Sequence, residues 1–386
     1  MLITVTLLLV TLVGFAALAF DVGHIMIVRN ELKNGADAAA LAGANCLNKK
    51  TVSPGTDCEA IVSPTLNWTT ASNKATNSIR LNKSDGTSLA NGTVTTGYWN
   101  VNGGTTMQPI SLSPLGPCTV AGGVMTTPCD KPAVMVTLSR ASGSNGGPVG
   151  TLIASMFGGA AVPVSARSVA VISSPSNVQP KSLFPMAINR CMFDQYWDSA
   201  TNSPKLATTS TLSYVDKSGK TDKIVLIPQT IGQPWVFRIG SAYHYDTCES
   251  GQWATFDDGL NNRPAIQTLI NDGNPTQLGI GDNTYISPGT MPVIYDDILG
   301  RYPTLAETPP PPSPTNDVTL VVVNVSSLKD SVSLPIPIFA FAGFHISGVN
   351  KSEKYVEGNF VNATTIPGGN GIGPSFGTYT PPRLAQ

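Results

Sequence analysis

The feature that most limits how this chain can fold is its N-terminal segment. The run from Leu2 to Phe20, LITVTLLLVTLVGFAALAF, contains no charged residue, and only Thr and Gly interrupt its apolar side chains. As an α-helix rising 1.5 Å per residue, the run would span about 30 Å, the thickness of the hydrocarbon core of a bilayer. We therefore predict a membrane-inserted helix here.

A cleaved signal peptide is the alternative, because Ala17-Leu18-Ala19 resembles a small-x-small cleavage site. A signal peptide carries basic residues before its apolar core, whereas the first basic residue of this chain, Arg29, follows the apolar run. We favour a retained segment. Its N-terminus is then a mature end, or a truncated start whose basic leader is missing.

The helical pattern continues past the apolar run. Apolar and small residues recur at steps of three and four, namely Ile25, Val28, Leu32, Gly35, Ala36, Ala39 and Gly43. This predicts one helix from Leu2 to about Cys46, about 65 to 70 Å long, whose second half is amphipathic and lies along a globular head. Gly35, Ala39 and Gly43 form a ridge of small residues that allows close packing, either on the chain's own head or on another subunit.

The stretch DVGHIMIVRNELKNGADAAALAGA after the apolar run resembles the N-terminal signature of the Tad-type (Flp) pilus proteins, the TadE/TadG-like group. The positions that carry the resemblance are Asp21, Gly23, Arg29, Leu32, Asp37 and residues 39–44. The later stretches GPVGTLIASMFGGAAVPVSARSVAVIS and LFPMAI also look like the body of larger TadG-like proteins. The resemblance implies a membrane-inserted, pilin-like precursor used in a surface filament, with these positions on its assembly helix.

Two features depart from the pattern of pilins. No leader with a prepilin-peptidase glycine precedes the apolar run, and no glutamate lies near its start as in ordinary type IV pilins. The resemblance therefore leaves the processing of the chain open.

Asp21 is the first charged residue of the chain. A charge at the centre of a bilayer is costly, so we expect Asp21 where the apolar run meets water or a partner. We favour a solvated carboxylate at the membrane boundary. In a bundle of helices, the alternatives are pairs with Arg29, with His24 or with the N-terminal amine of a neighbouring subunit.

Composition indicates an exported protein that does not bind nucleic acid. Charged residues make up 12% of the 386 residues, and the formal net charge of −1 provides no basic surface for nucleic acid. None of the six cysteines has the spacing of a zinc or haem site. We interpret them as disulfides formed in an oxidising compartment, and we favour pairing between neighbours among fifteen connectivities. The favoured pairs are Cys46–Cys58, Cys118–Cys129 and Cys191–Cys248.

The rest of the chain predicts an α+β fold, in which a long pilin-like helix precedes a β-rich head of two domains. Alternating runs at 93–101, 133–140 and 162–173 predict strands, with a short helix at 149–159. Beyond the linker SSPSNVQPKS (173–182), further strands are expected at 223–230, 234–240, 317–325 and 336–349, with a helix at 263–273 and a polyproline spacer at 308–315. The predicted parts are 1–48, 49–177 and 178–386.

No catalytic, metal or cofactor site is predicted. The three histidines, His24, His244 and His345, lie in different contexts and form neither a zinc pair nor a Ser-His-Asp order. We therefore favour a structural subunit of a homo-oligomeric Tad filament. It would enter the inner membrane first, meet other Tad components and end at the cell surface. A membrane-anchored assembly, minor-pilin or adhesion factor is the alternative, and a secreted enzyme is a third hypothesis.

Overall fold

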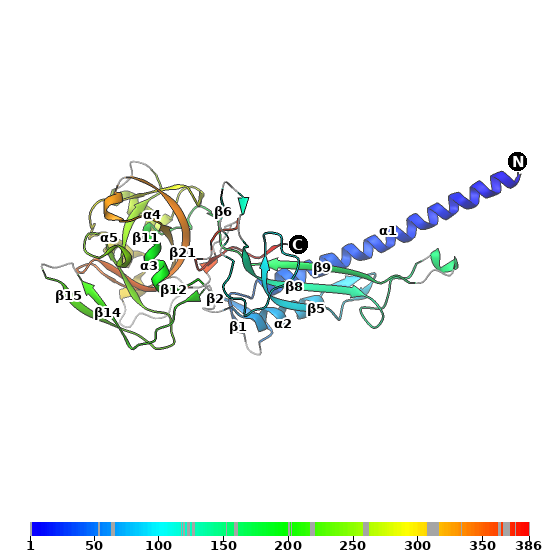
Figure 1. Ribbon diagram of the computed structural model, residues 1–386, viewed down its shortest axis with the longest axis horizontal. Coiled ribbons are helices and arrows are strands. Elements are labelled where there is room, and N and C mark those ends of the chain that lie inside the picture. The colour runs from blue at the N-terminus through cyan, green and yellow to red at the C-terminus, as the bar shows by residue number, and fades with distance from the viewer. Residues whose placement is uncertain are drawn as a thin grey trace.

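The computed structural model describes residues 2–52, 55–62, 66–116, 118, 120–121, 124–125, 128–151, 153–157, 161–199, 201, 203–216, 221–257, 262–306, 316–332, 334–361, 364–365, 371–374 and 376–385. Helix α1 (Leu2–Ala44) projects from one end of an elongated molecule, and the C-terminus lies near its middle (Figure 1). The α+β architecture predicted from the sequence is confirmed: a long apolar helix precedes a strand-rich region. The predicted polyproline spacer at 308–315 lies outside the described residues.

The second half of α1 packs on a four-stranded antiparallel sheet. The strands run in the order β25 (Arg383–Leu384), β9 (Val164–Val171), β8 (Asp130–Arg140) and β5 (Thr93–Asn100). Alternation along β8 directs Val134, Val136 and Leu138 into the core shared with α1, while Ala133 packs on the other face with Trp99. The strands predicted at 93–101, 133–140 and 162–173 are therefore confirmed.

Helix α2 (Trp68–Ile79) packs beside α1 in the same core. The sequence predicts no helix here, because WTTASNKATNSI is rich in Thr, Ser and Asn, which have low helix propensity. Packing stabilises the helix instead, since Ala71, Ala75 and Ile79 are at most 1% exposed. Short antiparallel pairs surround this sheet: β1 (Lys49–Val52) with β2 (Asp57–Val62), β3 (Lys83–Ser84) with β4 (Thr87–Ser88), and β6 (Val120–Ala121) with β7 (Val124–Met125).

A second core lies inside a ring of strands. Within the described residues, six strands pair in a closed circuit, which is β11 (Met186–Asn189), β20 (Asp317–Val323), β21 (Pro335–Asn350), β22 (Tyr355–Phe360), β16 (Phe237–Ser241) and β17 (Ser250–Thr255). The β11–β17 pairing closes the circuit, and β19 (Asn283–Ile286) bridges β17 and β21. The architecture is therefore a small barrel, in which aromatic side chains such as Phe237, Phe344 and Phe360 pack together.

Helices cover the barrel. They are α3 (Arg190–Tyr196), α4 (Arg263–Asp272) and α5 (Ile294–Arg301), with 3₁₀ turns η2 (Thr247–Glu249), η3 (Pro303–Ala306) and η5 (Lys329–Ser331). Helix α4, which the sequence predicts, begins where the Asn262 side chain accepts a hydrogen bond from the Ala265 amide and ends at Gly273, whose φ is 71°. The remaining short strands are β10 (Asn177–Val178), β12 (Trp197–Asp198), β13 (Ser203–Pro204), β14 (Thr211–Asp216), β15 (Lys223–Pro228), β18 (Leu278–Gly279), β23 (Thr364–Thr365) and β24 (Thr378–Tyr379).

The C-terminal segment ties the barrel region back to the four-stranded sheet. Strand β25 pairs with β9, and Ser174 forms a bridge with Gly373. Lys131, on β8, is 1% exposed. Its ammonium group donates a 2.9 Å hydrogen bond to the carbonyl oxygen of Gly373. Burial, assisted by the charge of Arg383 and opposed by that of Asp130, lowers the pKa of Lys131 to about 7.

Candidate functional site

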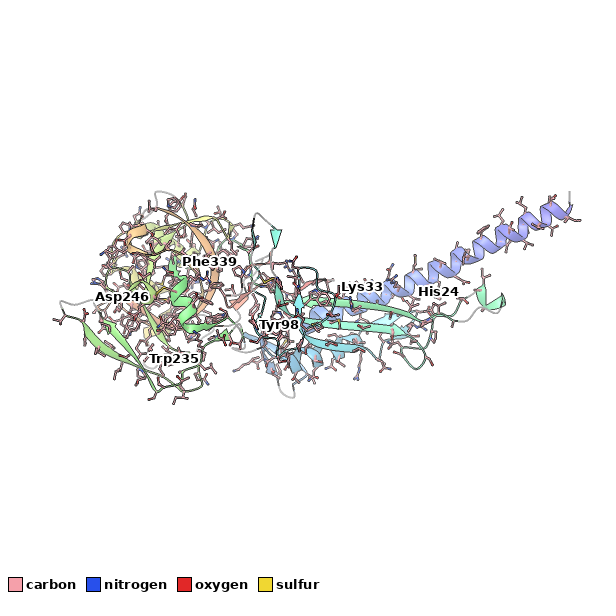
Figure 2. All side chains as sticks on the ribbon, viewed as in Figure 1. His24, Lys33, Tyr98, Trp235, Asp246 and Phe339 are labelled. Atoms are coloured by element: carbon pink, nitrogen blue, oxygen red, sulfur yellow. A yellow bond between two sulfur atoms is a disulfide. The ribbon has the colours of Figure 1, made fainter. Side chains whose placement is uncertain are left out.

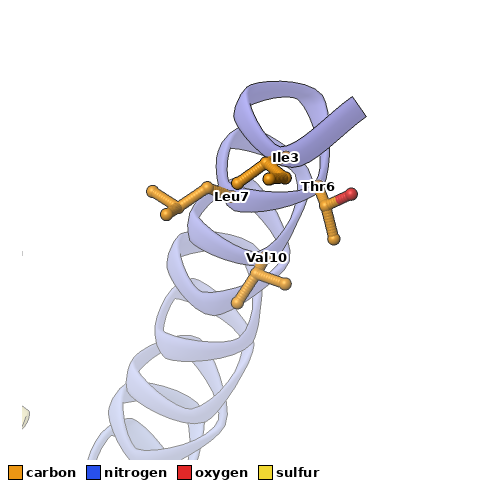
Figure 3. A pocket seen from close by; sticks show the side chains of 4 residues that line it. All are labelled: Ile3, Thr6, Leu7 and Val10. Carbon is orange, nitrogen blue, oxygen red and sulfur yellow. The ribbon is translucent and has the colours of Figure 1, made fainter. Parts of the chain in front are cut away.

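In the part of the chain that the structure describes, the first turns of α1 are exposed up to Phe20. Its large apolar side chains from Ile3 to Phe20 are 59% to 80% exposed. Figure 3 shows four residues of this surface, Ile3, Thr6, Leu7 and Val10, on the first turns of the helix. The helix is long and apolar enough to cross a membrane, by length and composition. Side chains of this kind are stable only where lipid or other protein covers them.

Asp21 lies where the head first meets α1. Asp21 is 4% exposed. Its carboxylate accepts a 2.7 Å hydrogen bond from the Ala154 amide, and the Ile153 amide lies 3.2 Å from each of the two carboxylate oxygens. These amides open η1 (Ala154–Phe157), in the connection between β8 and β9. The prediction of a solvated boundary carboxylate is therefore wrong. The carboxylate is buried because it satisfies backbone donors that would otherwise lack partners.

The connection that supplies these donors differs from the sequence prediction. A short helix was expected over 149–159, and the structure has the 3₁₀ turn η1 over Ala154–Phe157. The neighbouring residues 152 and 158–160 lie outside the described residues. Val149 and Val162 form an antiparallel bridge at the base of the connection.

A polar cluster lies one turn further along α1. The His24 ring nitrogen lies 3.1 Å from a carboxylate oxygen of Asp85, and the other oxygen of Asp85 accepts a 2.8 Å bond from Arg140. The Glu31 carboxylate accepts a 2.6 Å hydrogen bond from the Asp85 amide. The hydrogen bond from His24 and the nearby charge of Arg140 hold the pKa of Asp85 below its usual value. This cluster fixes the β3–β4 hairpin to α1; Figure 2 shows His24 where α1 leaves the head.

An exposed apolar stripe runs past this cluster on the free side of α1. Val22, Met26 and Ile27 are 43%, 61% and 60% exposed. A Cβ atom added to Gly23 would have no neighbouring atom within 4 Å. Arg29 is the first exposed charged residue after this stripe. The exposed apolar surface of α1 therefore continues about two turns beyond Asp21.

The ridge of small residues faces the chain's own head. A Cβ atom on Gly43 would lie 2.8 Å from the Ala71 carbonyl oxygen and 2.9 Å from the Cβ of Ala75, so α2 can approach only because the side chain is absent. Gly35 faces the side chains of Leu89 and Leu138, at 3.1 and 3.2 Å. Leu32 and Ala39 are fully buried in the same core, and Asp37 forms a 2.9 Å ion pair with Lys33.

The six cysteines form three disulfides between neighbours along the chain. Cys46–Cys58 ties the residues just after α1 to β2, and Cys118–Cys129 closes the loop before β8. Cys191–Cys248 ties α3 to η2 on the barrel. Cys46, Asp57 and Cys58 lie close together, but both sulfur atoms belong to a disulfide and offer no thiolate to a metal ion.

The three histidines lie at separate places. His24 contacts Asp85, the His244 ring lies 3.3 Å from the Lys354 ammonium, and His345 lies 2.6 Å from Asp317. The structure therefore does not bring any two of them together as ligands or as a catalytic pair. The residues that it does bring together at the site, Asp21 with Ile153 and Ala154, and His24 with Asp85 and Arg140, come from segments far apart in the sequence.

Two family models match the first part of the chain. Residues 1–45 match a family described as Flp pilus-assembly TadE/G-like, and residues 34–170 match a family described as Tad-like Flp pilus-assembly. The two matches cover α1, α2 and the β5–β8–β9 part of the four-stranded sheet, and the barrel lies beyond them. No curated protein and no solved structure matches the chain.

Proposed function

We propose that this chain, whose residues 1–170 match two families of Tad-type pilus-assembly proteins, is a pilin-like structural subunit of an extracellular Tad-type filament. In this role the bare half of α1 is first held in the inner membrane and is later bundled with the helices of other subunits. The disulfide-bonded head stays outside the bundle.

The observation that carries the proposal is the division of α1 into a bare half and a packed half. One continuous helix, Leu2–Ala44, is exposed up to Phe20 and anchored in the core of the head from Val28 onwards. Burying each large aliphatic or aromatic side chain stabilises a state by about 1.5 to 3 kcal/mol. A helix with many such residues can therefore leave lipid only for another apolar setting, which a helical bundle supplies.

The same division supports the proposed organisation of the chain. We assign residues 1–48 to the filament-core helix, 49–177 to a pilin-like head and 178–386 to a second, β-rich domain, from which β25 reaches back to the first sheet. The partners are further copies of the chain, other Tad components and the inner membrane before assembly. The proposed role requires no catalysis.

Fractionation tests this role. Surface fibres are sheared from cells, and the chain is quantified in the fibres and in the membrane fraction by mass spectrometry. A bulk subunit is abundant in the fibres. Fibres purified free of the chain, with the chain left in the membrane fraction, would show that the subunit role is wrong.

A minor, tip-located or adhesive component is the second candidate. The barrel lies at the end of the molecule opposite the N-terminus (Figure 1), and β15 there exposes Ile224 and Leu226 at 72% and 61%. An exposed apolar strand remote from the helix suits a contact with something other than the filament core. This candidate is supported if each fibre contains only a few copies of the chain.

A further inference from the structure

The connection between β8 and β9 has an unusual composition for the tip of an exposed hairpin. No charged residue lies between Arg140 and Arg167, and the middle of the connection reads GTLIASMFGGAA. Figure 1 shows this connection extending beyond β8 and β9, alongside α1 and towards its N-terminus. The hydrogen bonds from Ile153 and Ala154 to Asp21 hold it against the helix.

We propose that this tip, residues 153–157, enters the boundary between headgroups and acyl chains of the bilayer beside α1, as a second membrane contact of the chain. The proposal deepens the proposed function, because it rests on the insertion of the bare half of α1 into a bilayer. The occupant of this surface is therefore lipid, before any filament forms.

The depth of Asp21 places the tip at the bilayer. The exposed side chains on the free side of α1 are apolar through Val22, Met26 and Ile27, and the first exposed charged residue of the helix is Arg29, while the partly exposed His24 faces Asp85 of the head. Exposed basic residues mark the headgroup level at the end of a membrane helix. Asp21 is two turns nearer the N-terminus than Arg29, or about 12 Å along the axis. It therefore lies at or inside the edge of the hydrocarbon core.

A carboxylate at this depth needs donors that are not water, and the tip supplies them. An ionisable group at membrane depth is tolerated when it pairs with protein donors. The Ile153 and Ala154 amides provide this pairing, so the tip must lie at the same depth as Asp21. Because the tip carries no charge, this position adds no further buried ion.

Basic residues lie where the headgroups would be. Arg29 is exposed on α1, two turns beyond Asp21, and the exposed Arg167 of β9 lies beside Lys33 of α1, whose ammonium donates a 3.1 Å hydrogen bond to the Arg167 carbonyl oxygen. Anionic headgroups attract basic side chains at this level. Going away from the N-terminus of α1, the uncharged tip comes first and the basic residues follow. This order matches the order of acyl chains and headgroups at a bilayer surface.

Depth measurement with a fluorescent label tests the proposal on the full chain. All six native cysteines are paired, so an added cysteine is the single free thiol. Three variants are labelled with an environment-sensitive dye: Ser155→Cys in the tip, Val10→Cys in α1, and the matched control Ser213→Cys, an exposed serine on β14. Each is placed in vesicles of phosphatidylcholine and phosphatidylglycerol that carry nitroxide on the headgroup, on the shallow acyl chain or on the deep acyl chain.

The proposal predicts that the dye on Ser155→Cys loses most of its fluorescence to the shallow and headgroup nitroxides. The fluorescence of the dye on Val10→Cys is quenched by the deep nitroxide. The fluorescence of the dye on Ser213→Cys is not quenched by any of the three nitroxides. Deep quenching at Val10→Cys together with no quenching at Ser155→Cys overturns this inference alone. A blue-shifted but unquenched dye on Ser155→Cys means that protein covers the tip, which also overturns it. No quenching at Val10→Cys overturns the membrane insertion and this inference together.

Discussion

At the scale of single residues, Asp21 is the position where the sequence and the structure differ most instructively. Its place at the end of an apolar run predicts a boundary charge, and the structure gives it backbone donors 132 and 133 residues away along the chain. No local pattern identifies such a partner, because hydrogen bonds to backbone amides do not depend on the side chain of the donor residue. Only the presence of the acceptor could be predicted.

The Asp21 pairing makes a direct prediction. Asp21→Ala leaves the Ile153 and Ala154 amides without their carboxylate acceptor, which should lower the free energy of unfolding by about 1 to 3 kcal/mol. The amides of the tip should also exchange hydrogen faster. The full chain in detergent is measured by thermal denaturation and by amide hydrogen exchange. Arg29→Ala, an exposed position, is the control and should change stability by less than about 0.5 kcal/mol. Unchanged exchange at Ile153 and Ala154 would contradict the account.

Lys131 makes a prediction about pH. Its pKa falls from 10.5 in the unfolded chain to about 7 in the folded one. Between these values the unfolded state binds more protons, so the free energy of unfolding rises as pH rises from 7 towards 10, because the penalty for burying the charged ammonium is progressively relieved. Below pH 7 the ammonium is charged in both states, so the full penalty for burying it applies and this group adds no further change with pH. Lys131→Met should flatten this part of the stability curve, measured by chemical denaturation from pH 6 to 9.5. An identical slope in both proteins would show that Lys131 stays charged.

At the scale of elements, α1 is the part that sequence reasoning predicts best. Its first half follows from a continuous apolar run and its second half from recurrence at steps of three and four. The strands β5, β8 and β9 follow from alternation, and β20 and β21 from apolar, β-branched and aromatic runs. Helix α2 could not be predicted in this way, because its Thr, Ser and Asn residues carry a weak local signal and its stability comes from burial against α1. Tertiary packing decides such elements.

The contact between α1 and α2 predicts opposite results for two glycines. Gly43→Ala places a Cβ atom 2.8 Å from the Ala71 carbonyl oxygen, so the backbone of α2 must move. We expect a loss of about 1 to 3 kcal/mol in the free energy of unfolding. Gly23→Ala meets nothing within 4 Å and should be neutral or should stabilise the helix by up to about 1 kcal/mol. Thermal denaturation in detergent compares the two. Equal melting temperatures would mean that α2 does not pack on Gly43.

At the scale of the whole molecule, the closed barrel is the feature that the sequence could not reveal. Its strands are separately recognisable, but the closing pair joins residues 186–188 to residues 251–253 and depends on the register of the others. The family matches also end at residue 170, before the barrel begins. The positions of the strands could therefore be predicted from the sequence, and the order in which they pair could not.

The barrel makes a prediction about its disulfide. Cys191–Cys248 spans 57 residues and Cys46–Cys58 spans 12. In the chain-entropy description, these loops contribute about 4 and about 3 kcal/mol to stability. Replacing Cys191 and Cys248 together by serine should therefore destabilise the chain more than replacing Cys46 and Cys58 together. Urea denaturation followed by near-ultraviolet circular dichroism measures both. A larger loss for the shorter loop would mean that loop entropy does not control the effect.

The central claim is that the bare half of α1 is buried in the assembled filament while the head remains outside. Cells that produce Val10→Cys or Ser213→Cys yield filaments, which are treated intact with a large, hydrophilic maleimide. The account predicts that Ser213→Cys reacts at the rate of a free thiol and that Val10→Cys reacts only after the filament is dissociated. Equal reaction of the two cysteines in intact filaments would show that the helix is not in the core, and would contradict the account.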